Sequence, residues 1–455
     1  MRVISRFLLA VALSGMTVAM ATDNREFAKL KLSSEIPGDF FSPLEAAARD
    51  LDGLQHDFDV YSWQTFIALN WPTKPDGEAD SARRIGEGTE HVSTGVWEYW
   101  RSVDSIFLED GSKPAAWGNK GPSLATIEEP FDTGPLIDRN GRYAQFDILV
   151  NRPMFEFIVD HNLYFSEGQN EFKRSYGNIV FPCGREKVLD QKAQVRQVLA
   201  VGSILVKVAW KVLSATEIAS GRFYTRKLGG YSAAHQKGGA TVLGLVGMHI
   251  VHKSEDVPEW NWSTFEQVDN VSQGGSVIGH GAANSFFTAA REGLPVNTPP
   301  APPWDGRLTE PEGRRSRVVR IQPMSEEVKR LNAEAQTLLR LVNPSSVWQY
   351  YQLISTQWPT RPARVAAGFG SGNEGQAAKP RVCDVLALSP ADIPGGPAPL
   401  FLGNSTLESY IQSAVPNVSS SCMDCHANAT SESGEFSDFT YILTRAKPHH
   451  LQGAR

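Results

Sequence analysis

Residues 203–213 constrain the fold more than any other stretch of this 455-residue chain. Apolar and polar residues alternate here, so that Lys207 and Lys211 face one way while Trp210 and the valines face the other. A period of two residues with many β-branched side chains is typical of a β-strand. The stretch therefore predicts a strand with one apolar face.

Two further stretches, residues 146–150 and 241–252, also predict strands. Gly244 and Gly247 in the second stretch indicate a β-bulge or the close approach of another segment. Neighbouring strands of this kind favour an antiparallel sheet.

Helices are expected on both sides of these strands. Residues 61–69 form one that ends before Pro72, and Ser325 caps another whose apolar side carries Val328, Leu331, Ala335, Leu338 and Leu339. Two more are expected over residues 347–354 and from Asn404 through Tyr410. The predicted fold class is α+β, a β-rich central body with flanking helices and a helical C-terminal segment.

Five regions follow from this pattern. They are a signal peptide (1–21), an N-terminal helical and loop region (22–140), a β-rich body (141–294), a Pro-rich linker (295–306) and a helical C-terminal region (307–455).

The first 21 residues have the three parts of a secretory signal peptide. Arg2 and Arg6 precede an apolar run to about Ala19, and Ala19-Met20-Ala21 is a small-x-small cleavage site. The alternative is an uncleaved membrane anchor, but the run is shorter than the roughly 20 residues of a membrane span. We expect a protein exported to the periplasm, with no membrane span after cleavage.

The charge of the chain is mildly acidic. Cleavage removes two of the 44 Lys and Arg and none of the 50 Asp and Glu, which takes the formal charge from −6 to −8. Such a balance gives no reason to expect nucleic acid or an anionic membrane as a partner.

Four cysteines are too few for a disulfide-rich scaffold. Cys183 and Cys383 either form one disulfide in an oxidising compartment or remain two separate buried thiols.

The other two cysteines belong to the motif Cys422-Met423-Asp424-Cys425-His426. A C-x-x-C-H sequence is typical of c-type haem attachment. Two thiols at this spacing reach the two vinyl groups of one porphyrin edge, and the adjacent histidine then lies under the iron. The motif predicts one covalent haem c, with His426 as the proximal iron ligand. A zinc half-site and a thioredoxin-like dithiol are the alternatives.

The position of the motif bears on the sixth iron ligand. Only 29 residues follow His426, and none is a methionine. The ligand therefore comes from upstream, or from His449 or His450, or does not exist. An open position would allow small-molecule binding.

The upstream candidates are Met248, His249 and His252. On a strand, Met248 and His252 face one way and His249 faces the other, so the two histidines cannot easily bind one metal ion.

Other residues are candidates for the surroundings of the haem. Trp260, Trp262 and Phe265 either wall a haem pocket or belong to the core. Glu266 and Asp269 either carry protons beside the haem or lie in a capped turn after a strand. Lys207 and Lys211 share a strand face, and some β-rich haem proteins with a C-terminal attachment motif place a lysine near the porphyrin.

Several stretches together resemble a family of proteobacterial periplasmic proteins known only as cytochrome c family proteins. They are SWQTFIALNWP (62–72), GSILVKVAWKVL (202–213), GLVGMHIVHK (244–253), WSTFEQVDN (262–270), VWQYYQLISTQWP (347–359), SCMDCHANA (421–429) and SDFTYILTRAK (437–447). The resemblance implies thioether bonds at Cys422 and Cys425 and iron ligation by His426, and it implies no substrate.

We expect a periplasmic monohaem c-type cytochrome that binds haem iron and transfers electrons to or from a periplasmic redox partner protein. The alternative is a haem-c enzyme, an oxidoreductase acting on peroxide, oxygen or a small organic substrate at an open or weakly ligated iron. The roughly 400 residues ahead of the motif are more than electron transfer requires, which favours the alternative.

Overall fold

The computed structural model describes residues 29–38, 51–88, 94–118, 133–184, 187–189, 195–198, 201–228, 241–254, 257–271, 284–287, 295–302, 315–360, 396–412 and 421–449. The predicted signal peptide, Cys383 and His450 lie outside these residues.

The described residues form ten strands: β1 (Arg101–Ser102), β2 (Gln145–Val150), β3 (Lys187–Leu189), β4 (Val195–Val198), β5 (Ile204–Val212), β6 (Thr225–Leu228), β7 (Thr241–His252), β8 (Asn261–Gln267), β9 (Tyr351–Pro359) and β10 (Pro397–Ala398). The α-helices are α2 (Leu51–Leu69), α3 (Arg152–Asp160), α4 (Ser166–Tyr176), α5 (Ala215–Ala219), α6 (Glu326–Val342) and α7 (Cys422–His426). Short 3-10 helices are η1 (Val96–Tyr99), η2 (Val103–Ser105), η4 (Val347–Tyr350) and η7 (Tyr441–Arg445).

An eight-stranded antiparallel sheet organises the described part of the chain. Its order is β1-β2-β5-β7-β8-β9-β10, and β6 pairs with the start of β7. Strands β3 and β4 form a separate pair. Helices and an antiparallel sheet are both present, as the α+β prediction requires, and the three strands predicted from alternation are β2, β5 and β7.

Two predicted helices are wrong. Residues 347–350 form η4 and the chain then enters β9, which pairs with β8 and β10. Residues 405–411 form turns and a bend. The C-terminal region thus contributes an interior strand to the sheet, between β8 and β10. Of the predicted Pro-rich linker, Asn297 is tied by its side chain to the backbone of Val319.

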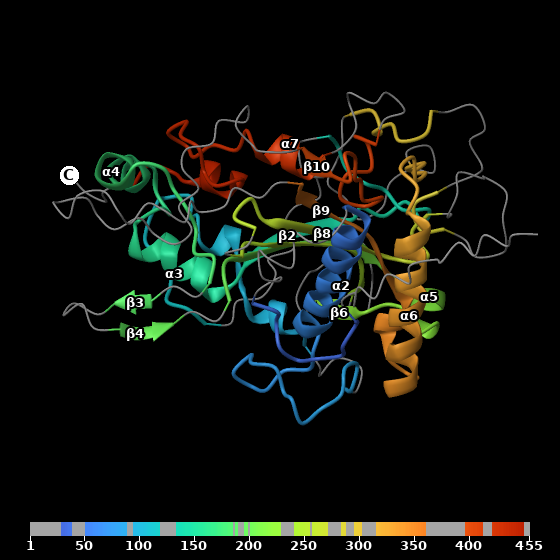
Figure 1. Cartoon of the computed structure of the whole chain (residues 1–455). Coiled ribbons are helices and arrows are strands. Elements are labelled where there is room, and N and C mark those ends of the chain that lie inside the picture. The colour runs from blue at the N-terminus through green and yellow to red at the C-terminus, as the bar shows by residue number, and fades with distance from the viewer. Residues whose placement is uncertain are drawn as a thin grey trace, which may run out of the picture.

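The two faces of the sheet have different coverings (Figure 1). Helices α2 and α6 pack on one face, where Trp63 and Phe66 meet Phe265 and Leu339 in the largest hydrophobic cluster. The other face carries α3 and, above the sheet in Figure 1, α7 with the chain that follows it. The C-x-x-C-H motif therefore lies on the sheet face opposite α2.

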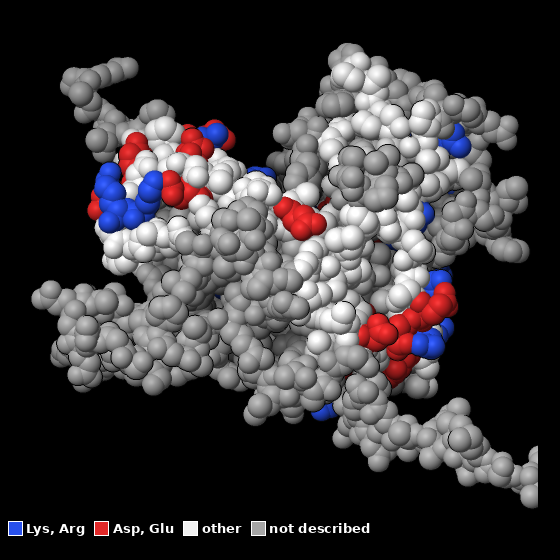
Figure 2. Space-filling model, turned by 45° about the horizontal axis from the view of Figure 1, so that its top comes forward, with Lys and Arg blue, Asp and Glu red and all other residues white. Residues whose placement is uncertain are grey.

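Figure 2 shows the side of the molecule that carries the motif. Charged side chains gather at its two ends, over α4 and over α6, and most of the described surface between them is uncharged. The charges at both ends are paired, as in Glu171 with Arg174 and Glu326 with Lys329. No helix among the described residues is long and apolar enough to cross a membrane.

Candidate functional site

The motif begins at a point that is fixed to the sheet. Ser421 caps the single turn of α7 by accepting a hydrogen bond from the amide of Asp424. The fully buried Gln357 of β9 accepts a hydrogen bond from the Met423 amide at 2.8 Å and donates one to the Ser421 hydroxyl at 3.3 Å. Met423 itself is buried in the core beneath. These contacts orient the remaining side chains of the motif.

His426 has a defined tautomer. Its Nδ1 lies 2.7 Å from the carbonyl oxygen of Phe439, so Nδ1 carries the hydrogen and donates it. Burial, with a smaller contribution from the charge of Lys207, lowers the pKa of His426 to about 3. The imidazole is therefore neutral with its lone pair on Nε2, the form in which histidine binds a metal ion while a carbonyl fixes the ring.

The turn that supplies this carbonyl is strained. Asp438 and Phe439 both have positive φ angles, 53° and 61°. Non-glycine residues in this region cost free energy and are often found at functional sites. A fully buried ion pair holds the turn, because Lys253 Nζ lies 2.5 Å from Asp438 Oδ2, which also accepts the amide of Phe181 at 2.7 Å.

A cavity of about 600 Å³, including its part open to solvent, lies between α7 and the sheet. Its apolar lining residues are Leu205, Val251, Trp260, Trp262, Ile411 and Phe439. Its polar lining residues are Lys207, His249, Glu408, Ser421 and Thr440, and the motif contributes Cys422, Cys425 and His426.

The two cysteines of the motif are free thiols that face this cavity. Burial raises the pKa of both, and Glu408 adds to the effect at Cys422, so both are uncharged. Cys183, by contrast, is disulfide-bonded. No group of three or more His, Cys, Asp and Glu side chains in the described ranges is arranged to hold a metal ion.

These residues fit a covalently attached haem. One wall offers two uncharged thiols and one imidazole with its lone pair on Nε2, and the apolar side chains around them suit a porphyrin. Trp262 packs on the His426 ring at 4.4 Å between centroids, and the Tyr441 hydroxyl donates to the Cys425 carbonyl at 2.8 Å.

Of the three upstream ligand candidates, only His249 lines the cavity. Met248 lies on the opposite sheet face in the core under α2, and His252 is hydrogen-bonded there to Tyr61. The strand geometry thus excludes Met248 and His252 from the cavity. Downstream of the motif, His449 is exposed and packs against Phe165.

The other candidate residues also fall into two groups, those that line the cavity and those that do not. Trp260 and Trp262 wall the cavity, whereas Phe265 belongs to the opposite core. Lys207 lines the cavity. Lys211 is buried next to Asp138 and Glu217, at 3.5 Å and 2.5 Å.

Glu266 and Asp269 are not cavity residues. Glu266 is in β8 and pairs with Arg320, and Asp269 follows β8 and pairs with Arg222. Neither the proton-carrier prediction nor the capped-turn alternative describes Glu266.

The lining of the same cavity contains a residue that the sequence did not single out. Glu408 Oε2 lies 3.2 Å from His249 Nε2 and accepts the amide of Asn404 at 3.0 Å. Lys207 is the direct cross-strand neighbour of His249. Burial alone would raise the pKa of Glu408, but His249 and Lys207 outweigh burial and hold that pKa below its ordinary value.

Comparison of the chain with protein-family models, curated proteins and solved structures finds no match.

Proposed function

We propose that this chain is a periplasmic monohaem c-type cytochrome that binds one covalent haem and transfers electrons. The observation that carries the proposal is the arrangement at one wall of the cavity, where two thiols and an imidazole face the same space. The Phe439 carbonyl holds the His426 ring with its lone pair on Nε2. A match to the C-x-x-C-H sequence does not by itself require that these three side chains face one cavity.

Cys422 and Cys425 would hold the porphyrin through thioether bonds, and His426 would bind the iron. When bound, the haem supplies a one-electron redox centre whose potential depends on its ligands, hydrogen bonds and burial. The chain sets two of these terms, since the Phe439 carbonyl increases the basicity of the imidazole and the apolar lining limits water.

Export supports the same proposal, because c-type haem is attached outside the cytoplasm and residues 1–21 have the pattern of a signal peptide. A periplasmic redox protein would then be the partner. The proposed family is that of the periplasmic cytochrome c family proteins.

The test is expression of the full chain in a bacterial host with c-type haem attachment machinery. The mature protein should gain the mass of one haem, retain it under denaturing conditions, and show a reduced c-type absorption band. The variant Cys422→Ala/Cys425→Ala should lose covalent haem. The matched control is Asp424→Asn, a change at the exposed position between the two cysteines, which should keep it. A wild-type protein without covalent haem refutes the proposal.

A haem-c enzyme is the second candidate, and one observation favours it. Beside its apolar side chains, the cavity lining carries the ionisable groups of His249, Glu408 and Lys207. Electron transfer alone has no need of an ionisable group at that place.

A further inference from the structure

We propose that His249 and Glu408 form a proton-transfer pair that serves a small ligand bound in the same cavity as the haem. This inference rests on the proposed haem site and adds a ligand class to it. The ligand binds iron through one atom and exchanges a proton or a hydrogen bond with the pair, as peroxides do.

The geometry of the pair carries the inference. His249 Nε2 lies 3.2 Å from Glu408 Oε2, and both side chains are almost fully buried, at 9% and 8% exposure. The two groups are close enough for a proton to pass between the carboxylate and the imidazole. A base oriented by a third group in this way is the usual arrangement for acid–base catalysis.

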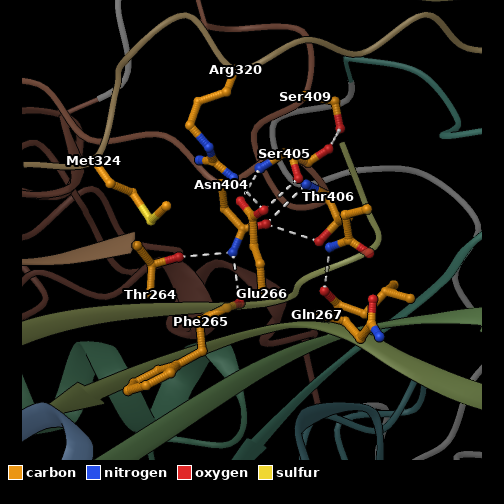
Figure 3. A network of polar contacts seen from close by, with 12 residues as sticks. Thr264, Phe265, Glu266, Gln267, Arg320, Met324, Asn404, Ser405, Thr406 and Ser409 are labelled. Carbon is orange, nitrogen blue, oxygen red and sulfur yellow. Dashed lines mark hydrogen bonds and ion pairs between the residues drawn. The ribbon is translucent and has the colours of Figure 1, made fainter. Parts of the chain in front are cut away.

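The carboxylate is fixed by a network that begins in β8 (Figure 3). Glu408 belongs to residues 401–412, here called the cavity loop, which also contributes Ile411 to the lining. Asn404 donates its backbone amide to Glu408 and its side-chain amide to Thr264 and to the Phe265 carbonyl, at 2.8 Å and 3.0 Å. The loop is thereby attached to the strand next to that of His249.

A second anchor of the cavity loop is the carboxylate of Glu266. It accepts the amide of Ser405 at 2.6 Å and the Ser405 hydroxyl at 2.7 Å, and it pairs with Arg320. Figure 3 shows these contacts converging on the start of the loop. Neither partner of the His249–Glu408 pair therefore depends on a mobile side chain for its position.

The charges around the pair are consistent with proton exchange. Lys207, the cross-strand neighbour of His249, and Glu408 have side chains of opposite charge. Leu205, Val251 and Trp262 contribute apolar side chains to the same lining. In such surroundings a proton moved to the imidazole is stabilised by the nearby carboxylate.

Iron ligation by His249 is the competing role. The contact with Glu408 favours the proton-transfer role, because it uses Nε2, the nitrogen through which His426 is also expected to bind. The two roles predict opposite spectra and opposite effects of substitution, so one set of measurements separates them.

The experiment uses the haem-loaded full chain and cyanide as the probe. At neutral pH cyanide is present as HCN. When it binds ferric iron the iron–carbon bond forms, the hydrogen–carbon bond breaks with its electron pair remaining on carbon, and the proton passes to His249. Carbon monoxide binds ferrous iron without proton transfer and reports steric effects alone.

We expect a wild-type spectrum of an open iron site that binds both probes. His249→Gln should slow cyanide binding by about 10²- to 10⁴-fold, the usual contribution of a positioned acid–base group. Glu408→Gln should slow it by a smaller factor, and it tests the pair should His249→Gln fail to fold. Carbon monoxide binding should change little, and the surface control Glu326→Gln on α6, far from the cavity lining, should leave both rates near wild type.

The opposite pattern overturns the inference. A low-spin wild-type spectrum unaffected by carbon monoxide, with probe binding gained in His249→Gln, assigns His249 to the iron. Unchanged cyanide rates in both variants remove the pair from proton transfer. Either result leaves covalent haem intact, whereas failure of the proposed function itself appears as a protein without a haem band.

Discussion

Glu266 and Asp269 lie three residues apart, and each pairs with an arginine, but their surroundings differ. The side chains of Glu266 and Arg320 are 0% and 2% exposed, whereas those of Asp269 and Arg222 are 21% and 35% exposed. The substitutions Glu266→Gln and Asp269→Asn remove one negative charge each with little change in size. They therefore compare a buried ion pair with a partly exposed one.

The expected costs follow from burial. Glu266→Gln leaves the Arg320 guanidinium buried without its anion, which costs about 3–5 kcal/mol of unfolding free energy. Asp269→Asn loses a pair that water already screens, worth about 1 kcal/mol or less. We expect a difference of at least about 2 kcal/mol between the two variants. The double variant Glu266→Gln/Arg320→Met should recover part of the loss, because no unpaired charge remains.

Urea unfolding at neutral pH measures these costs as shifts of the midpoint at a common slope. The cavity loop is attached through Glu266, so Glu266→Gln should also slow cyanide binding of the loaded protein, and Asp269→Asn should not. If both variants lose the same small amount of unfolding free energy, burial does not determine how much an ion pair contributes to stability.

The remaining predictions concern other buried contacts. Burial raises the pKa of Asp59 from 3.8 to about 7, so the folded protein keeps a proton that the unfolded chain releases near pH 4. The unfolding free energy of the wild type should therefore fall relative to that of Asp59→Asn by up to about 4 kcal/mol as the pH rises from 4 to 7, at about 1.4 kcal/mol per pH unit. Urea unfolding at several pH values measures this, and a difference between the two proteins that stays constant over the range contradicts it. Gly247→Ala should lower the unfolding free energy measured in urea by about 1–3 kcal/mol, because a Cβ atom there would lie 2.1 Å from Thr406 Oγ1 of the cavity loop. A variant as stable as the wild type would show that the loop does not lie this close to Gly247. Asp438→Asn should cost about 3–5 kcal/mol by leaving Lys253 unpaired, and it should raise the haem reduction potential by loosening the carbonyl that holds His426; redox titration checks the second effect, and an unchanged potential argues against it.

Alternation of polarity was sufficient for β5 but not for β9. In β5 the valines and Trp210 share one face and the lysines lie on the other with Leu205 and Ala209, so the sequence alternates although both faces are buried. Strand β9 is buried on both faces, and its polar Thr356 and Gln357 are fully buried because they bond to α2 and to the start of α7. A strand whose polar side chains contact other segments instead of water has no visible alternation, so its aromatic residues resembled a helix.

The turns at residues 405–411 have a different cause. Asn404 is a residue that caps helices, and it suggested a helix start; Ser405 and Thr406 follow it. Their side chains bond instead to β8 and to one another, as when Thr406 donates its amide and its hydroxyl to Asn404. Such bonds compete with a helix, and the competition is decided by distant partners.

In the candidate site, too, some residues could be predicted from local sequence and others could not. Cys422, Cys425 and His426 follow from a local motif, and the position of His249 follows from the parity of a strand. Glu408 and the Phe439 carbonyl follow from neither, because their partners are 159 and 13 residues away in sequence and no periodic pattern connects them.

Three segments around the cavity are each attached to the sheet region by a different buried polar residue. Gln357 holds the start of the motif, Lys253 holds the turn before η7 through Asp438, and Glu266 holds the cavity loop. The three anchors lie on or next to the neighbouring strands β9, β7 and β8. A haem attached to one wall would thus meet a His249–Glu408 wall that is positioned independently of the haem. If the proposed haem is bound, substitutions at His249 or Glu408 should therefore change the chemistry of a ligand in the cavity, while Cys422 and Cys425 still hold the haem.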